Sequence, residues 1–259
     1  GYTSPEGDDY AIIGLMNTIA FVKVPEMTVI DQIPAPSNFD YYYHRDMKTY
    51  RNYCYAVAEM PGVNQGLMIM DLQYLPDSVH YIKSYTAGGV TSHNLSIDTA
   101  KGFAYILSSN GQGFRIVDLS DPENPAEAGY VNTQVIHDVY ARNDTVWVAE
   151  GSRRSFSMYD CSDKSSPQLL ARWFPPAGGY AHNIWPTDDG KYALTTEETL
   201  YKTIKMWKLD DLQNIELKGE FLGSNNIAHN VHVMGNYCYT SHYAYGITVL
   251  DISNPDTLK

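Results

Sequence analysis

The sequence predicts an all-β fold, and its internal repeats predict a β-propeller of four-stranded blades. One motif recurs six times along the 259 residues, at intervals of about 42–50 residues. Short apolar runs bounded by Pro, Asp, Asn and Ser fill each interval, as strands and turns do. No segment keeps an apolar period of about 3.6 residues, so we expect almost no helix.

The recurring motif is a strand that ends in a turn. Its clearest copy is GFRIVDLSDPENP at residues 113–125, and weaker copies start at residues 18, 66, 155, 203 and 246. Two copies carry Lys23 and Lys208 where the others have an acid. An Asp at the end of a strand caps the following turn with its side chain, so we interpret the acids as structural. They are Asp71, Asp118, Asp160 and Asp251.

Each motif lies within a predicted blade. A second strand precedes it, as in KYALTTE at 191–197, a further strand precedes that one, and a fourth follows the turn. Four short strands per repeat are typical of a propeller blade. We expect the complete ring to hold six or seven blades, because the first and last blades look incomplete. We predict one domain over 1–259, with approximate blades at 1–36, 37–87, 88–132, 133–175, 176–223 and 224–259.

A two-residue motif starts the first strand of five blades. Successive pairs are 48, 44, 45 and 47 residues apart, which is the blade repeat. The first strand of each blade lines the central channel of a propeller, so these residues should converge near one mouth. Three of the second strands run back to that mouth and end in Glu59, Glu150 and the pair Glu197-Glu198. The pairs are Arg45-Asp46, His93-Asn94, His137-Asp138, His182-Asn183 and His229-Asn230.

These pairs have two interpretations. In the first, His nitrogens and carboxylate or amide oxygens bind a divalent metal, either a transition metal or calcium, with Glu59, Glu150 or Glu197 as catalytic base. The candidate ligands are then His93, His137, His182, His229, Asn94, Asp138, Asn183 and Asn230. In the second, each pair joins one blade to the next by satisfying buried backbone groups. The recurrence of the pair in five blades favours the second interpretation. Arg45, which stands where the other four pairs have His, breaks the repeat and favours the first interpretation, a specialised site.

The composition excludes some functions. The formal net charge of −12 disfavours binding to a phosphate backbone. No apolar run is long enough to span a membrane. The three cysteines form no disulfide framework, and we interpret Cys54 and Cys238 as buried strand residues.

One stretch resembles a known family. FRIVDLSDPENPAEAGYV at 114–131 is similar to the LVIVD repeat, a propeller repeat of bacterial and archaeal surface proteins. Together with AHNIWPTDDGKYALTTEE at 181–198 and the stretch at 228–255, it resembles the choice-of-anchor B family. That resemblance implies a secreted propeller attached to the cell surface, with no settled biochemical activity. A more distant similarity, to selenium-binding protein or methanethiol oxidase propellers, implies channel-facing His residues that hold a metal.

We therefore expect an extracellular or cell-surface propeller with a structural, adhesive or assembly role, including fibre formation. Its partners would be further copies of the chain or other surface proteins, with no nucleic acid. The alternative is a metal-dependent enzyme of the oxidase or hydrolase type, with a His-rich site at the channel mouth.

Overall fold

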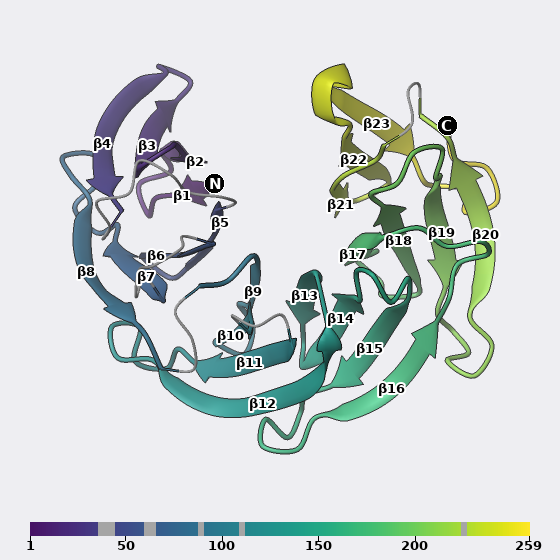
Figure 1. Cartoon of the computed structure of the whole chain (residues 1–259). Helices are drawn as coiled ribbons and strands as arrows, with labels where there is room; N and C mark the ends of the chain where they lie inside the picture. Colours follow the sequence, from purple (N-terminus) through teal and green to yellow (C-terminus); the bar gives the residue numbers. More distant parts are fainter. Residues whose placement is uncertain (36–44, 60–65, 88–90, 109–111, 224–226) are drawn as a thin grey trace. The chain divides into compact units, whose positions relative to one another are not determined.

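The computed structural model describes residues 1–35, 45–59, 66–87, 91–108, 112–223 and 227–259, and nearly all of their regular structure is β-strand (Figure 1). The predicted fold class, an all-β propeller with almost no helix, is confirmed. The strands form five antiparallel sheets of four strands and one of three. The helical part of the described residues is a single 3-10 turn, η1 (Tyr243–Tyr245). The chain divides into two compact units, one of residues 1–110 and 114–131, the other of 111–113 and 132–259.

The first three sheets are antiparallel meanders, each formed by consecutive strands. Their strands are β1 (Tyr2–Thr3), β2 (Asp9–Gly14), β3 (Thr18–Val24), β4 (Thr28–Pro34), β5 (Arg45–Tyr50), β6 (Tyr53–Ala58), β7 (Leu67–Asp71), β8 (His80–Tyr85), β9 (Leu95–Asp98), β10 (Phe103–Leu107), β11 (Gln112–Asp118) and β12 (Ala126–Val135). The short β1 agrees with the little room that the sequence leaves before the second strand of that repeat.

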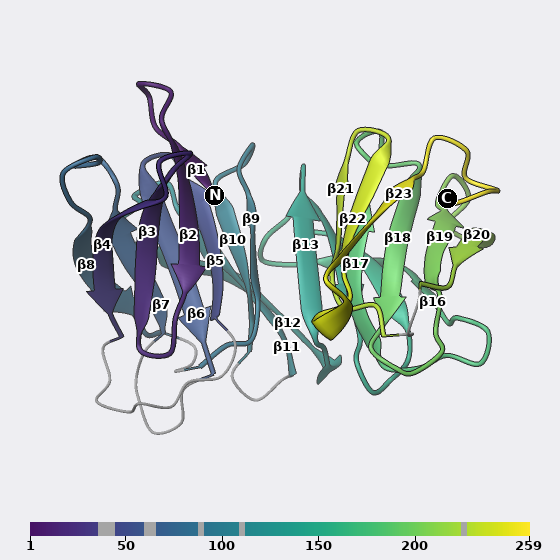
Figure 2. The same cartoon turned by 90° about the horizontal axis from the view of Figure 1, so that it is seen from above.

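The last three sheets repeat this plan, and Figure 2 shows β18, β19 and β20 of one of them side by side. Their strands are β13 (Asp138–Arg142), β14 (Thr145–Ala149), β15 (Phe156–Asp160), β16 (Gln168–Trp173), β17 (Ala181–Pro186), β18 (Tyr192–Glu197), β19 (Ile204–Lys208), β20 (Glu216–Phe221), β21 (Val231–Met234), β22 (Tyr237–Ser241) and β23 (Ile247–Asp251). The final sheet therefore has three strands where the others have four.

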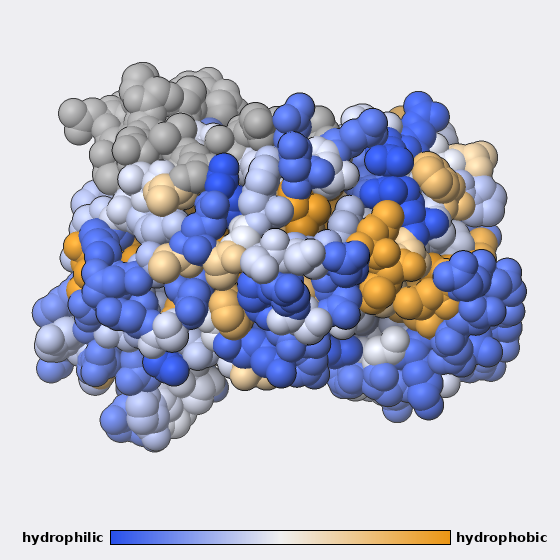
Figure 3. Space-filling view, turned by 90° about the horizontal axis from the view of Figure 1, so that it is seen from below, coloured by the Kyte–Doolittle hydropathy of each residue, from blue (hydrophilic) through white to orange (hydrophobic). Residues whose placement is uncertain are grey.

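The core lies between successive sheets of each unit. Alternate residues of a strand point to opposite faces, so the repeated strand supplies apolar side chains to both neighbouring sheets. In β7, Met68 and Met70 pack with Phe21 of the first sheet, whereas Leu67 and Ile69 pack toward the third sheet. Hydrophilic side chains dominate the surface that Figure 3 shows, as expected for an acidic chain.

All three cysteines are free and buried. Burial raises the pKa of the Cys54 and Cys161 thiols to about 12 and that of Cys238 to about 11. A protonated, buried thiol is a poor nucleophile and a poor metal ligand, so these cysteines serve packing. No helix in the described part of the chain is long and apolar enough to cross a bilayer.

The four repeated Asp side chains cap turns. A carboxylate oxygen of Asp71 accepts a hydrogen bond from the Gln73 N–H at 2.8 Å. Asp118, Asp160 and Asp251 each accept the same hydrogen bond from the backbone N–H of the residue two positions later, at 2.7, 2.8 and 2.9 Å. Hydrogen bonds from Ser162 and Ser253 hold the pKa of Asp160 and Asp251 below the ordinary value.

We expect Asp71→Ala to lower the free energy of unfolding by about 1 kcal/mol, because the Gln73 N–H loses its acceptor beside a buried strand end. Urea unfolding followed by far-UV circular dichroism measures the change. Asp71→Asn keeps an oxygen acceptor and should lose less than half as much. An Asp71→Ala midpoint equal to that of the wild type would contradict the capping role.

Candidate metal centre

Three predicted His residues lie at the start of three successive sheets in the second unit. His137 directly precedes β13, His182 is in β17, and His229 lies two residues before β21. The pairing of β17 with β18 shifts register between Ala181 and Asn183, so His182 is the extra residue at an irregularity. Such a bulge re-aims a side chain relative to the regular strand.

The three imidazoles form a stepped row. The ring centroids of His137 and His182 are 4.2 Å apart, and those of His182 and His229 are 4.1 Å apart. The Nδ1 of His137 lies 2.9 Å from the His182 carbonyl oxygen, and the Nδ1 of His182 lies 2.9 Å from the His229 carbonyl oxygen. A carbonyl only accepts, so each Nδ1 carries the hydrogen and a neutral ring has its lone pair on Nε2.

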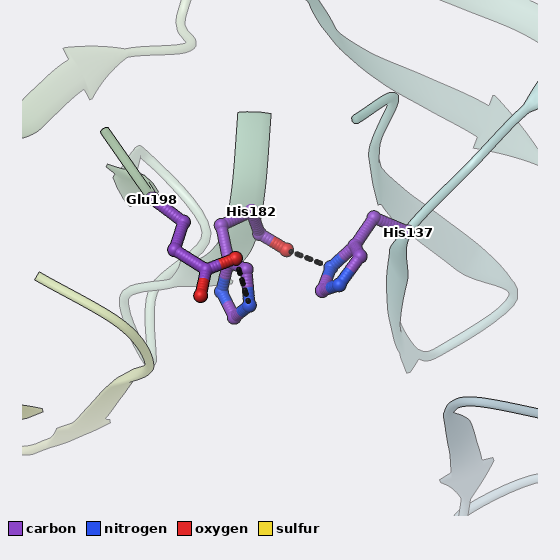
Figure 4. Close-up of side chains that lie close together, drawn as sticks. All are labelled: His137, His182 and Glu198. Carbon is purple, nitrogen blue, oxygen red and sulfur yellow. Dashed lines mark hydrogen bonds and ion pairs between the residues drawn. The ribbon is translucent and has the colours of Figure 1, made fainter. Parts of the chain in front are cut away.

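A carboxylate completes a candidate ligand set. Glu198 Oε2 lies 3.6 Å from His182 Nε2, and Figure 4 shows this carboxylate beside the His182 ring with His137 on the other side. Ligand atoms of His137, His182 and Glu198 all lie within 4.8 Å of one another. Ligands bound to one zinc-like ion at about 2.0–2.2 Å stand roughly 3–4 Å apart, so small side-chain movements would suffice. The His182 side chain is 3% exposed and that of Glu198 is 30% exposed, so solvent reaches the carboxylate side.

The sequence prediction placed the pair Glu197-Glu198 at the channel mouth and named Glu197 as a candidate base, whereas the structure places Glu198 at the His residues. Glu197 instead points into the core, where its Oε2 lies 2.5 Å from Lys205 Nζ and its Oε1 accepts the Gly179 N–H. Glu197 is the last residue of β18, and Glu198 is the first residue after the strand. The sequence reasoning named the two acids together and had no signal that separated them.

The other two predicted bases are also held in ion pairs. Arg172 donates to both oxygens of Glu150 at 2.9–3.0 Å, and Ser155 and Ser157 donate to the same carboxylate. Burial alone would raise the pKa of Glu150, but the hydrogen bonds and charge of Arg172 lower it below the ordinary value. Glu59, in the first unit, lies 3.0 Å from His93 Nδ1. These contacts give Glu150 a structural role and pair Glu59 with His93 within the first unit.

The second members of the pairs connect successive sheets. In the second unit, Asp138 accepts a hydrogen bond from the Asn183 amide, and Asn183 Oδ1 accepts the Val231 N–H at 2.9 Å. In the first unit, Asp46 Oδ2 accepts the Asn94 amide and the Leu95 N–H, both at 3.0 Å. These amides and carboxylates therefore act in blade-to-blade hydrogen bonding.

Two pairs depart from this scheme. Asn230 is exposed, and its N–H donates to Ser241 Oγ at 3.0 Å. Arg45 has its backbone in β5, and its side chain lies outside the described residues. Asp46, Asn94, Asp138 and Asn183 thus make the sheet-to-sheet hydrogen bonds that the second interpretation describes. Metal binding by the His residues, the first interpretation, stays a prediction.

Comparison with known proteins agrees with this fold. The model of the LVIVD repeat family matches residues 96–133 and 226–258. The chain is a β-propeller that carries LVIVD repeats. The two matched segments of this LVIVD propeller cover the third repeat and the last one. Comparison of the sequence with curated proteins finds no match.

Solved structures match the LVIVD propeller over nearly its whole length. A functionally unknown protein from Desulfotomaculum acetoxidans matches with a TM-score of 0.76 and 15% identity, over 97% of this chain and 78% of that one. A protein from Lactobacillus plantarum matches with a TM-score of 0.71 and 15% identity, over 93% and 76%. The Cps50 β-propeller domain of Myceliophteria thermophila matches with a TM-score of 0.69 and 9% identity, over 94% and 80%. At these identities the likeness is one of fold.

Proposed function

We propose that this propeller binds a divalent transition-metal ion through His137, His182 and Glu198. The observation that carries the proposal is the approach of Glu198 Oε2 to within 3.6 Å of His182 Nε2, beside a second imidazole. Backbone carbonyls hold both rings in the tautomer that presents Nε2, which is how proteins orient metal-binding His residues. The metal would be the functional group of the site.

The ligand chemistry favours a transition metal over calcium. Calcium takes about 6–8 oxygen ligands, and this set supplies two nitrogens and one carboxylate. Two His and one carboxylate are a known ligand set of zinc and of non-haem iron. Three protein ligands leave positions for water or substrate, so a bound ion could polarise a small molecule for hydrolysis or oxidation.

Titration with Zn²⁺ tests the site. The wild type should bind one Zn²⁺ per chain in equilibrium dialysis read by elemental analysis. His182→Ala and Glu198→Gln should each weaken binding by about 100-fold, because each removes a ligand from a three-ligand set. Far-UV circular dichroism of the variants separates loss of the ligand from loss of the fold.

His80→Ala is the matched control. His80 lies on β8 in the first unit, stacked on Tyr74 at 3.9 Å between ring centroids. Its removal takes away an imidazole and should leave the Zn²⁺ affinity unchanged. The proposal fails if the wild type binds no Zn²⁺, or if a folded double variant His137→Ala, His182→Ala binds as the wild type does.

A position outside the cell or at its surface is a second part of the proposal. It is supported by the resemblance of the chain to surface-protein repeats, together with the two matched LVIVD segments. Fractionation of the source cells, followed by detection of the protein with an antibody, tests it. Recovery in the cytosolic fraction alone would contradict this placement.

A further inference from the structure

A cavity lies between the second and third sheets, within the first unit. Its empty volume is about 350 Å³, including the part that is open to solvent. Four residues of its wall belong to the apolar core between these two sheets, and they are Val57, Leu67, Ile106 and Val117. Tyr85, half-buried against the same core, also lines the cavity. Such a wall is suited to the apolar part of a small ligand.

Arg115 is the only charged residue among the described residues that line the cavity. It lies opposite Ile106 in the pairing of β10 with β11, so both side chains leave the sheet on the same face. Within the described part of the chain, the Nε of Arg115 is buried and makes no hydrogen bond. A buried N–H of a charged group is costly without an acceptor, and an acceptor atom of a bound ligand would remove that cost.

Two contacts hold the guanidinium group of Arg115 in place. Its Nη1 lies 2.5 Å from Glu127 Oε2, and its Cζ lies 4.7 Å from the centroid of the Tyr130 ring. Both contacts use other parts of the group, so the Nε–H stays in a fixed position as an unused donor.

The charge around this donor favours an uncharged acceptor over an anion. Glu127 already balances the positive charge of Arg115. A carboxylate in the cavity would lie near the Glu127 carboxylate and would add a charge to a chain whose formal net charge is −12. A carbonyl oxygen accepts the same hydrogen bond without that repulsion and loses less hydration on entering an apolar cavity.

We propose that this cavity binds a small, uncharged, apolar molecule that carries one carbonyl acceptor, such as a ketone, ester or amide with a single ring or a short chain. The ring or chain contacts the apolar wall, and the Nε of Arg115 donates a hydrogen bond to the carbonyl oxygen. All residues of this site belong to the first unit, whereas His137, His182 and Glu198 belong to the second. The inference therefore does not depend on the proposed metal site.

Titration of the full chain with three small probes, followed by saturation-transfer difference NMR, tests the proposal. Acetophenone carries a ring and a carbonyl, ethylbenzene carries the ring alone, and benzoate carries the ring and a carboxylate. Acetophenone should bind about tenfold more tightly than ethylbenzene, because only the ketone accepts the hydrogen bond from Arg115. Benzoate should bind more weakly than acetophenone. Tighter binding of benzoate, equal binding of acetophenone and ethylbenzene, or no binding of any probe would overturn the proposal, the last because the cavity would then hold water only.

Arg115→Met removes the donor and keeps an apolar stem. It should lower the affinity for acetophenone about tenfold and leave that for ethylbenzene unchanged. Arg51→Met is the matched control and should bind both probes as the wild type does. Arg51 belongs to the same unit, and its Cζ lies 5.1 Å from the centroid of the Tyr50 ring, but it does not line the cavity.

A second variant locates the bound probe and decides the matter if Arg115→Met does not fold. Ala87 is an exposed residue of the cavity wall, so Ala87→Trp should fill the entrance without disturbing the core. It should lower the affinity for both acetophenone and ethylbenzene at least tenfold, while far-UV circular dichroism shows an intact fold. A folded Ala87→Trp variant that binds both probes as the wild type does, or a folded Arg115→Met variant that still prefers acetophenone, would overturn the proposal.

Discussion

Replacement of Lys205 by Met is expected to lower the free energy of unfolding by about 3–5 kcal/mol. Lys205 Nζ lies 2.5 Å from Glu197 Oε2, and the two side chains are 4% and 1% exposed. Loss of the ammonium group leaves a carboxylate in the core without its compensating charge, which is the costly way to break a buried pair. Urea unfolding at neutral pH measures the effect.

Two controls separate this cause from ordinary packing. The double variant Lys205→Met, Glu197→Met removes both charges and should recover most of the lost stability, because well-packed apolar residues replace buried ion pairs at little cost. Lys191→Met breaks an exposed pair with Asp189 at 3.8 Å and should change stability by less than about 0.5 kcal/mol. A Lys205→Met variant as stable as the Lys191→Met variant would show that the buried pair contributes nothing.

Replacement of Arg172 by Met should also lower the free energy of unfolding by several kcal/mol. It should in addition reverse the way in which the contribution of Glu150 to stability changes with pH. In the wild type, Arg172 holds the pKa of Glu150 below its ordinary value in spite of burial. The pair therefore contributes stability above the unfolded-state pKa of about 4.3, and this contribution is lost as pH falls through the lower folded-state pKa.

Burial is the largest single influence on the pKa of Glu150 and raises it. Without the opposing guanidinium, the pKa should rise above the unfolded value. The variant should then lose about 3 kcal/mol at pH 7 and become more stable as the pH falls toward 5. Arg153, whose Nε lies 3.6 Å from Glu150 Oε2, limits the loss. Thermal unfolding from pH 7 to pH 4 measures both effects, and Arg172→Lys is the control that keeps a positive charge. A variant whose stability falls with pH as steeply as the wild type would contradict the assigned pair.

Much of the fold was predictable because its signals are local. The alternation in FRIVD marks β11, and the Asp at its end caps the next turn through an N–H only two residues away. The element ends were less predictable. The His93-Asn94 pair was expected to start the first strand of its blade, but β9 begins only at Leu95. Strand ends depend on pairing with a neighbour, which local composition does not report.

The candidate site was predictable only in part. The blade-length spacing predicted a group of four His residues, His93, His137, His182 and His229. In the structure the rings of His137, His182 and His229 follow one another at 4.1–4.2 Å, and His93 lies beside Glu59. The spacing did not show that Glu198 rather than Glu197 approaches these His residues. The spacing also treated the His and the following Asp or Asn as one functional unit, whereas they face different partners.

The sequence by itself determined the strand class, the turn caps and the recurrence of His along the chain, because these depend on residues within about one repeat. Only the tertiary structure decided which groups share a site. The carbonyl that sets the His137 tautomer belongs to His182, 45 residues away, and the cation that holds Glu150 comes from Arg172 on another strand. Charge pairing and burial at such distances follow from how the sheets pack, and packing is a property of the folded chain.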